Sequence, residues 1–191
     1  MASITIFGDG NMGTAIGGIA TTAGATVQTI TTVTPPATIE GDIVVLAVPY
    51  PSLASIAASY GPQLAGKVVV DITNPLDFQT LDALTVPLGS SAAAELAALL
   101  PEAKVLKAFN TTFAATLATG VVGGLPTTVL VAGDDAEAKQ ALIGLVKAGG
   151  LDALDAGSLK RAHELEALGF LQLTLAIAGT VPWTGGFAVA K

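Results

Sequence analysis

The sequence predicts an α/β fold with a doubly wound, mainly parallel sheet and a short C-terminal helical extension. Short apolar runs alternate with helix-like stretches along most of the 191 residues, which is typical of parallel sheets flanked by helices. The apolar runs are nearly continuous, and this pattern indicates strands that are buried on both faces. A glycine-rich segment directly after the first apolar run supports the same fold class.

Six strands are expected, at residues 3–7, 26–30, 42–49, 67–72, 104–109 and 127–133. Helices are expected between several of them, at residues 11–23, 51–60, 92–100 and 134–148. One crossover helix is expected to be absent or reduced to a turn, because Pro35 and Pro36 exclude a regular helix through the middle of residues 31–41.

The C-terminal region is expected to form one long helix over residues 157–179, with Ser158 as its N-cap. Its apolar residues recur at helical spacing, at Leu165, Leu168, Leu171, Leu175 and Ala178. The final residues are expected to form a loop and a short strand. We therefore expect one compact unit, in which residues 1–156 form a nucleotide-binding domain and residues 157–191 pack on it.

The composition argues against several classes of partner. The chain has 8 Lys plus Arg against 15 Asp plus Glu, a net charge of −7 that repels nucleic acid and anionic membranes. It has no cysteine, so neither a disulfide framework nor a thiolate metal site is expected, and no other metal site is predicted. No apolar run is long enough for a spanning helix, and no secretory signal is visible. These features predict a cytoplasmic protein.

The segment Gly8-Asp9-Gly10-Asn11-Met12-Gly13 has the G-x-G-x-x-G spacing of a dinucleotide-binding loop. In such loops the first glycine permits a tight turn, the second admits a pyrophosphate, and the third allows close packing of helix and strand. The N–H groups near Asn11 and Met12 would then point at the phosphates. A tight turn without a ligand is the alternative, because the chain has 22 glycines. The strand–turn–helix setting favours a Rossmann-type nucleotide site.

The end of the second strand favours NADP over NAD. An NAD site usually carries an Asp or Glu there to hold the ribose 2′-hydroxyl. The sequence instead reads QTITT over residues 28–32, so Thr31 and Thr32 are available to hydrogen-bond a 2′-phosphate, although no arginine is nearby.

Several longer motifs resemble the small F420-dependent NADP reductase family across nearly the whole chain. They are GDGNMG (8–13), LAVPY (46–50), DITNPL (71–76), KVLKAFNTTFA (104–114), VAGDD (131–135), LDAGSLKRAHELEAL (154–168) and the terminal GGFAVAK. The resemblance implies that NADP(H) and a second flat redox molecule, F420 or a flavin, stack together and that hydride passes directly between them. No catalytic residue is then expected, because the protein mainly aligns two rings.

The resemblance and the order of the strands place further cofactor-binding residues in the loops after the strands. They are Ala47, Val48 and Pro49 after the third strand, Asn74 and Pro75 after the fourth, and Asn110, Thr111, Thr112 and Ala114 after the fifth. Simple strand ends and turns are the alternative at Pro49 and at Asn74-Pro75.

The chain departs from the family pattern in two respects. Better-characterised members carry Ser-Arg-Arg-like residues and a helix after the second strand, where this chain has threonines and prolines. The chain also has few cations to meet the acidic tail of F420. The acceptor is therefore open among F420, another flavin and a quinone-like molecule.

Two isolated residues are interpreted as structural. His163 is the only histidine, so it cannot build a triad or a histidine-rich metal site. Lys107 could be compared with the catalytic lysine of hydroxyacid dehydrogenases. It lies inside a strand-like run, however, and the sequence lacks the large all-helical domain of those enzymes, so we interpret it as structural.

Three functions remain open from the sequence. The first is an NADP(H)-dependent oxidoreductase that moves hydride to a deazaflavin, flavin or similar small acceptor. The second is a non-catalytic NADP(H)-binding module that senses redox state, and the third is an imine reductase of the pyrroline-carboxylate type. The long apolar C-terminal helix predicts a homodimer, with its leucine face buried against the domain or a twin subunit.

Overall fold

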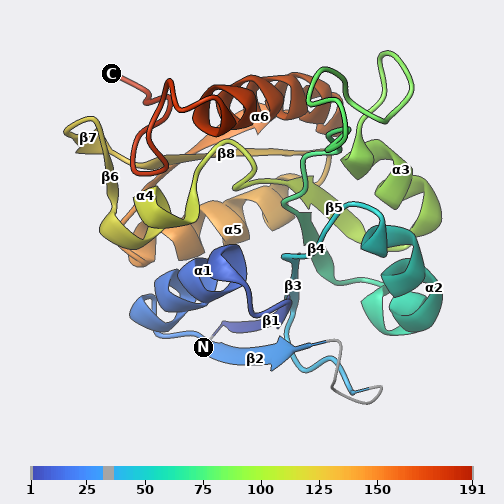
Figure 1. Ribbon diagram of the computed structural model, residues 1–191. Helices are drawn as coiled ribbons and strands as arrows, with labels where there is room; N and C mark the ends of the chain where they lie inside the picture. Colours follow the sequence, from blue (N-terminus) through green and yellow to red (C-terminus); the bar gives the residue numbers. More distant parts are fainter. Residues whose placement is uncertain (1, 32–36, 191) are drawn as a thin grey trace.

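A seven-stranded sheet organises the described part of the chain, residues 2–31 and 37–190 of a computed structural model (Figure 1). Its strands are β1 (Ser3–Phe7), β2 (Thr26–Ile30), β3 (Ile43–Leu46), β4 (Val68–Asp71), β5 (Lys104–Lys107), β8 (Thr128–Gly133) and β9 (Asp152–Gly157). They lie in the order β2-β1-β3-β4-β5-β8-β9, and each neighbouring pair is parallel except β5 and β8. The predicted α/β fold with a mainly parallel sheet is confirmed.

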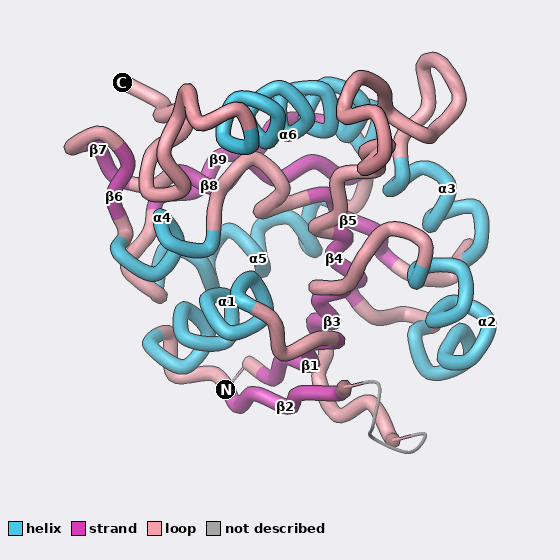
Figure 2. Tube along the Cα trace, in the orientation of Figure 1, coloured by secondary structure: helices cyan, strands magenta, loops and turns pink. Residues whose placement is uncertain are grey.

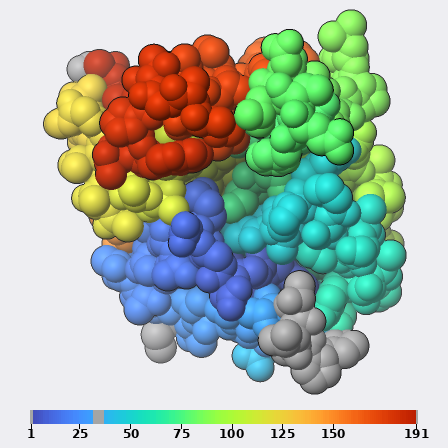
Figure 3. All heavy atoms as spheres, viewed as in Figure 1, coloured from blue at the N-terminus to red at the C-terminus, as the bar shows by residue number. Residues whose placement is uncertain are grey.

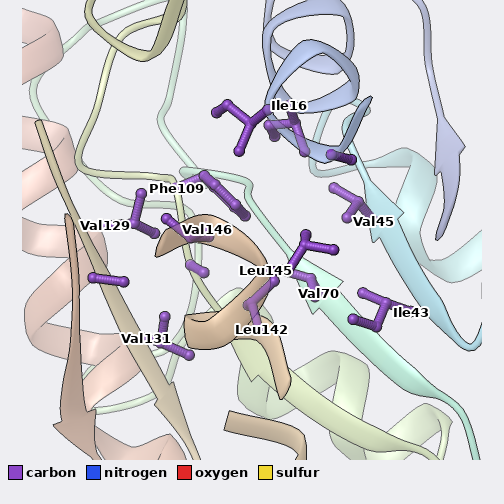
Figure 4. Close-up of a cluster of buried hydrophobic side chains, with 14 of the residues drawn as sticks. Ile16, Ile43, Val45, Val70, Phe109, Val129, Val131, Leu142, Leu145 and Val146 are labelled. Atoms are coloured by element: carbon purple, nitrogen blue, oxygen red, sulfur yellow. The ribbon is translucent and has the colours of Figure 1, made fainter. Parts of the chain in front are cut away.

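Helices cover both faces of the sheet, as a doubly wound fold requires. On one face lie α1 (Asn11–Thr22), α4 (Ala114–Thr119) and α5 (Ala136–Ala148). On the other lie α2 (Ser52–Leu64), α3 (Ala92–Leu99) and α6 (Ala162–Ile177). Strand β3 serves both cores, because Ile43 and Val45 belong to the first (Figure 4) and Val44 and Leu46 to the second.

The structure corrects several of the expected elements. Strand β9 was not predicted, because its sequence DALDAG interrupts the apolar pattern with two aspartates. The expected helix over residues 157–179 is wrong at its start: Gly157 ends β9, and a 3₁₀ turn (Leu159–Arg161) precedes α6. Ser158 precedes that turn, but its side chain makes no capping hydrogen bond. Helix α4 and the hairpin of β6 (Val121–Val122) and β7 (Leu125–Pro126) were also missed.

The expected absence of a crossover helix holds for the described residues between β2 and β3, namely 31 and 37–42. Residues 180–190 contain no strand, so the short C-terminal strand is not found. Of the helices in the described ranges, none has the length and hydropathy needed to cross a lipid bilayer. The predicted boundary after residue 156 falls at the last residue of β9, and the division into domains stays a prediction.

Helix α6 turns a mixed face toward the rest of the molecule, so the predicted burial of its leucine face against the domain is wrong, and burial of that face against a twin subunit stays a prediction. Its buried residues are Ala162, Leu165, Glu166, Gly169, Gln172 and Ala176. Leu171 is 49% exposed, whereas Gln172 is buried and donates to the Thr111 carbonyl. Small and hydrogen-bonding residues face inward because α6 lies against strand-end loops, whose backbone groups need partners.

Candidate functional site

A cavity of about 790 Å³ opens where the loops after β1, β3, β4 and β5 meet the C-terminal segment. These loops converge between α1 and α6 (Figure 2), and the surface is hollowed there between the blue α1 region and the red C-terminal region (Figure 3). The cavity is lined by Gly10, Asn11, Met12, Ala47, Val48, Pro49, Tyr50, Ile72, Thr73, Asn74, Phe78, Phe109, Asn110, Thr112, Phe113, Ala114, Ala115, Leu173 and Trp183.

Most of the predicted cofactor-binding residues come together in this cavity. Those that line it are Gly10, Asn11, Met12, Ala47, Val48, Pro49, Asn74, Asn110, Thr112 and Ala114. Asp9, Pro75 and Thr111 lie beside it in the same loops without lining it, and Pro75 and Thr111 are buried. Thr31 follows the end of β2, where the Gly8 N–H donates to the Ile30 carbonyl at 2.9 Å. Thr32 lies outside the described residues.

The three glycines of the loop meet different surroundings. A Cβ on Gly8, whose φ is +104°, would lie 2.3 Å from the Ala47 carbonyl oxygen, and one on Gly13 would lie 2.2 Å from the Gly8 carbonyl oxygen. Both positions therefore require glycine for the fold itself. A Cβ on Gly10 would meet nothing within 4 Å. Gly10 also stands at the N-cap of α1, where no side chain caps the helix, so the helix N-terminus is open toward the cavity.

A pair of asparagines joins the loops after β4 and β5. The Asn74 Nδ2 donates to the Asn110 carbonyl at 2.8 Å, and the Asn110 Nδ2 donates to the Asn74 Oδ1 at 2.9 Å and to the Leu165 carbonyl at 2.8 Å. Helix α6 can approach this pair because Gly169 has no side chain: a Cβ there would lie 2.3 Å from the Asn74 Oδ1.

Two buried polar atoms of residues that line the cavity have no hydrogen-bond partner among the described residues. They are the Asn110 Oδ1 and the Thr73 Oγ1. Buried polar groups are normally paired, so such atoms in a cavity wall fit a ligand that carries polar groups of its own.

The turn after β5 aims the predicted residues at the cavity. Phe109 is fully buried and adopts the left-handed region with φ of 62°, which is uncommon for a residue with a side chain. The Thr112 Oγ1 donates to the Phe109 carbonyl at 2.8 Å and holds the turn closed. Strand β5 consequently ends at Lys107, two residues before the predicted end. The residues that follow it contribute Phe109, Asn110 and Thr112 to the cavity wall.

A buried charge cluster stands behind that wall. The Lys107 Nζ lies 2.8 Å from the Asp71 Oδ2 and 2.7 Å from the Glu166 Oε1, and all three side chains are fully buried. The Glu166 carboxylate also accepts from the Ala92 N–H at 3.0 Å, at the start of α3. Burial raises the pKa of Glu166, although Lys107 opposes that shift. The cluster ties β4, β5, α3 and α6 together, which agrees with the structural interpretation of Lys107.

Among the described residues that line the cavity, Tyr50 is the one with a titratable side chain. Its hydroxyl donates to the Glu95 Oε2 at 2.5 Å. This hydrogen bond, together with burial, raises the pKa of Tyr50 to about 12. His163 stays outside the lining, and its Nδ1 lies 3.0 Å from the Ser90 carbonyl. The part of the lining that the structure describes therefore contains no group that changes its charge near neutral pH.

Sequence reasoning missed several residues of the lining. The missed residues that directly adjoin predicted ones are Tyr50, Thr73, Phe109, Phe113 and Ala115, whereas Ile72 and Phe78 lie two and three positions from Asn74 and Pro75. No local sequence pattern predicts that Leu173 and Trp183 line the cavity, because the C-terminal segment reaches it only through tertiary packing. Trp183 contacts Phe113 with ring centroids 4.9 Å apart.

The fold and this strand-end cavity place the chain among the Rossmann-type α/β proteins, and comparisons narrow the class. Residues 25–75 match the family described as NADP oxidoreductase coenzyme F420-dependent. The F420-dependent NADP reductase of Methanocaldococcus jannaschii is 33% identical over 150 residues, which cover 76% of this chain and 67% of that protein. The chain therefore belongs to the F420-dependent NADP reductase family of oxidoreductases, as its motifs suggested.

Three further proteins are similar to this chain over different shares of their length. A solved structure from Arthrobacter sp. FB24, provisionally assigned as an F420-dependent NADP-reductase, matches with a TM-score of 0.86 and 27% identity over 100% of both chains. Metalloreductase STEAP3 of Rattus norvegicus is 40% identical over 119 residues, but this match covers only 22% of that longer protein. An imine reductase of Streptomyces aurantiacus, with a TM-score of 0.64 and 16% identity over 93% of this chain and 62% of that one, shares the fold alone.

Proposed function

We propose that the protein is an NADP(H)-dependent oxidoreductase that transfers hydride between nicotinamide and a deazaflavin such as F420, a flavin or a similar acceptor. The observation that carries this proposal is a single cavity with the open N-terminus of α1 on one side and aromatic side chains on the other. The volume of about 790 Å³ is in the range of small-molecule sites. Such a cavity suits a nucleotide and a flat ring held together.

The residues present fit a dinucleotide phosphate. Gly10 leaves the approach to the first turn of α1 open, and the N–H groups of Asn11 and Met12 stand at the positive end of the helix dipole. The unpaired Asn110 Oδ1 and Thr73 Oγ1 offer polar partners to a carboxamide. When bound, NADP(H) supplies the hydride.

The environment of the adenosine ribose supports NADP rather than NAD. The described residues 26–31 and 37–39 contain no carboxylate, and the first one after them is Glu40, whose N–H donates to the Gln28 Oε1 at 3.1 Å. We propose that Thr31, together with Thr32, donates hydrogen bonds to that phosphate. The preference rests on the absence of repulsion, so we expect moderate discrimination between the two cofactors.

The protein's own contribution to the reaction is alignment. Phe109, Asn74 and Asn110 stand on turns fixed by backbone and side-chain hydrogen bonds, so the cavity wall is set before a ligand enters. Tyr50 keeps its proton near neutral pH and is not a general base. Direct hydride transfer needs little acid or base assistance, and the apolar lining excludes water from the reacting rings.

The test combines cofactor titration with a matched pair of variants. We expect purified protein to bind NADPH more tightly than NADH and to oxidise NADPH with at least one flavin or deazaflavin. Gly10→Ala places a methyl group where the pyrophosphate would lie, and we expect the Kd for NADPH to rise about tenfold. The control Gly18→Ala adds the same methyl group to the exposed side of α1, where it meets nothing within 4 Å.

Equal effects of the two substitutions would remove the glycine loop from the proposed site. Tight NADPH binding with no oxidation by any acceptor would instead favour the non-catalytic sensing module. Reduction of a cyclic imine by NADPH, without reduction of any flavin or deazaflavin, would instead favour the imine reductase.

We further propose that the protein forms a homodimer through the outer face of its C-terminal segment. Leu171 is 49% exposed, Ile177 is 43% exposed and Phe187 is 44% exposed, so large apolar side chains of this segment are not covered by the chain itself. Sedimentation at micromolar concentration should show a dimer, and a monomer would contradict this proposal.

A further inference from the structure

The described residues of the cavity wall include no ionised side chain, and this composition limits the charge of the acceptor that the cavity can bind. The described lining residues include neither Asp, Glu, Lys, Arg nor His. Its polar groups are amides and hydroxyls, and the rest is apolar or aromatic. The outer part is aromatic as well, since Phe78 is 70% exposed and Trp183 is 51% exposed while both line the cavity.

The cations of the described residues are placed elsewhere, and most are already paired. Lys104 lies 3.1 Å from Asp135, Lys139 lies 2.8 Å from Asp155, and Arg161 lies 2.9 Å from Glu164. The Lys67 Nζ donates to the Gly41 carbonyl at 2.7 Å. Lys104, Lys139 and Arg161 are each paired with a carboxylate, and Lys67 precedes β4, at the end of that strand opposite the loop that lines the cavity, so none of these side chains offers an anion site there.

Charged side chains outside the lining contact it at two residues: the Lys107 Nζ donates to the Thr73 carbonyl, and the Glu95 carboxylate contacts Tyr50. Behind the wall, Lys107 faces two carboxylates, those of Asp71 and Glu166. The Glu95 carboxylate accepts a hydrogen bond from the hydroxyl of Tyr50, and Tyr50 lines the cavity. The N-terminus of α1 is the one described feature of the lining that attracts anions, and the proposed function assigns it to the cofactor phosphates.

We infer that the acceptor is an uncharged aromatic redox ring, such as a flavin or quinone nucleus without phosphate or carboxylate groups. This inference rests on the proposed function and names the substrate class of the same site. In the reaction, a carbon–hydrogen bond of the reduced nicotinamide breaks and its two electrons form a new bond between that hydrogen and the acceptor ring. The acceptor takes one further proton from solvent, so NADPH, acceptor and H⁺ yield NADP⁺ and the dihydro form of the acceptor.

Riboflavin and FMN provide the test, because they share one ring and differ by a single phosphate. In the presence of NADP⁺ and 20 mM salt, we expect the Kd from flavin fluorescence to be higher for FMN than for riboflavin. A dianion about 10 Å from one carboxylate such as that of Glu95 is repelled by about fourfold in Kd in a water-like medium without salt, and by about twofold at 20 mM salt. We expect this ratio to approach one at high salt, because ions screen the repulsion. An equal or lower Kd for FMN at low salt would overturn the inference.

A designed cation should reverse the preference. Phe78→Lys adds a positive charge at an exposed lining position, and we expect the Kd of FMN to fall below that of riboflavin. The matched control Phe78→Gln, of similar length and neutral, should leave FMN the weaker ligand. If Phe78→Lys leaves the ratio unchanged, the acceptor does not lie in this cavity and the inference fails. Failure of the proposed function would look different, since neither flavin would then oxidise NADPH in the wild-type protein.

Discussion

Replacing Gly169 with alanine tests the contact between α6 and the cavity wall. The new Cβ would lie 2.3 Å from the Oδ1 and 2.8 Å from the Cγ of Asn74, so the asparagine side chain has to move. That movement breaks the two hydrogen bonds that join Asn74 and Asn110. The substitution therefore reports on the geometry of the site through a residue that does not line the cavity.

The opposing contributions can be compared. Alanine stabilises a helix interior by about 1 kcal/mol relative to glycine. Two lost hydrogen bonds cost about 1 kcal/mol each, and overpacking costs about 1–3 kcal/mol. The net expectation is a loss of about 2–4 kcal/mol in the free energy of unfolding, together with a roughly tenfold higher Kd for NADPH.

Urea denaturation and NADPH titration measure both effects, with Gly144→Ala as the control. Gly144 lies in α5, and a Cβ there meets nothing within 4 Å, so this variant should gain about 0.5–1 kcal/mol. If Gly169→Ala gains stability as the control does and binds NADPH as the wild type does, the described packing of α6 against Asn74 is refuted.

Three further substitutions probe the charges around the cavity. Lys107→Met should lower the free energy of unfolding by about 3–5 kcal/mol, because it leaves two buried carboxylates without their cation, and urea denaturation at pH 7 checks this. Glu166 has a raised pKa in the folded state, so its contribution to stability is fully present below its unfolded pKa and is lost as pH rises through the folded pKa. The wild type should therefore lose stability relative to Glu166→Gln as the pH rises above about 4.5. Urea denaturation of both proteins across this range measures the free energy of unfolding of the variant minus that of the wild type, and a difference that falls with pH would contradict the raised pKa. Tyr50→Phe should change the rate of hydride transfer by less than about threefold, and the wild-type rate should show no ionisation of Tyr50 between about pH 6 and 9 because its pKa is about 12.

The glycine loop was predictable because its physics is local. A strand, a turn that needs positive φ at Gly8 and a helix packed closely at Gly13 are all encoded within one short segment. The loops after the parallel strands were predictable for a related reason, since the carboxyl ends of such strands share one edge of the sheet. Ten predicted residues consequently line the same cavity.

The remaining features depend on contacts between distant segments. The burial of Lys107 needs the carboxylates of both Asp71 and Glu166, which come from β4 and α6. No local sequence pattern predicts that these three side chains meet. Strand β9 carries Asp155 within the sheet, and Lys139 of α5 compensates this charge at 2.8 Å. The leucine spacing of α6 did not predict which face packs on the domain, because hydrogen bonds of Glu166 and Gln172 decide which side faces inward.

The central claim is that this cavity transfers hydride directly from NADPH to a flat acceptor. The most direct measurement uses NADPH deuterated at the transferring C4 position and 5-deazariboflavin, whose reduced C5–H does not exchange with water. After a single turnover in ordinary water, mass spectrometry should find one deuterium on the reduced deazaflavin. Reduced deazaflavin without deuterium, or no reduction of any flavin or deazaflavin by NADPH, would contradict the account.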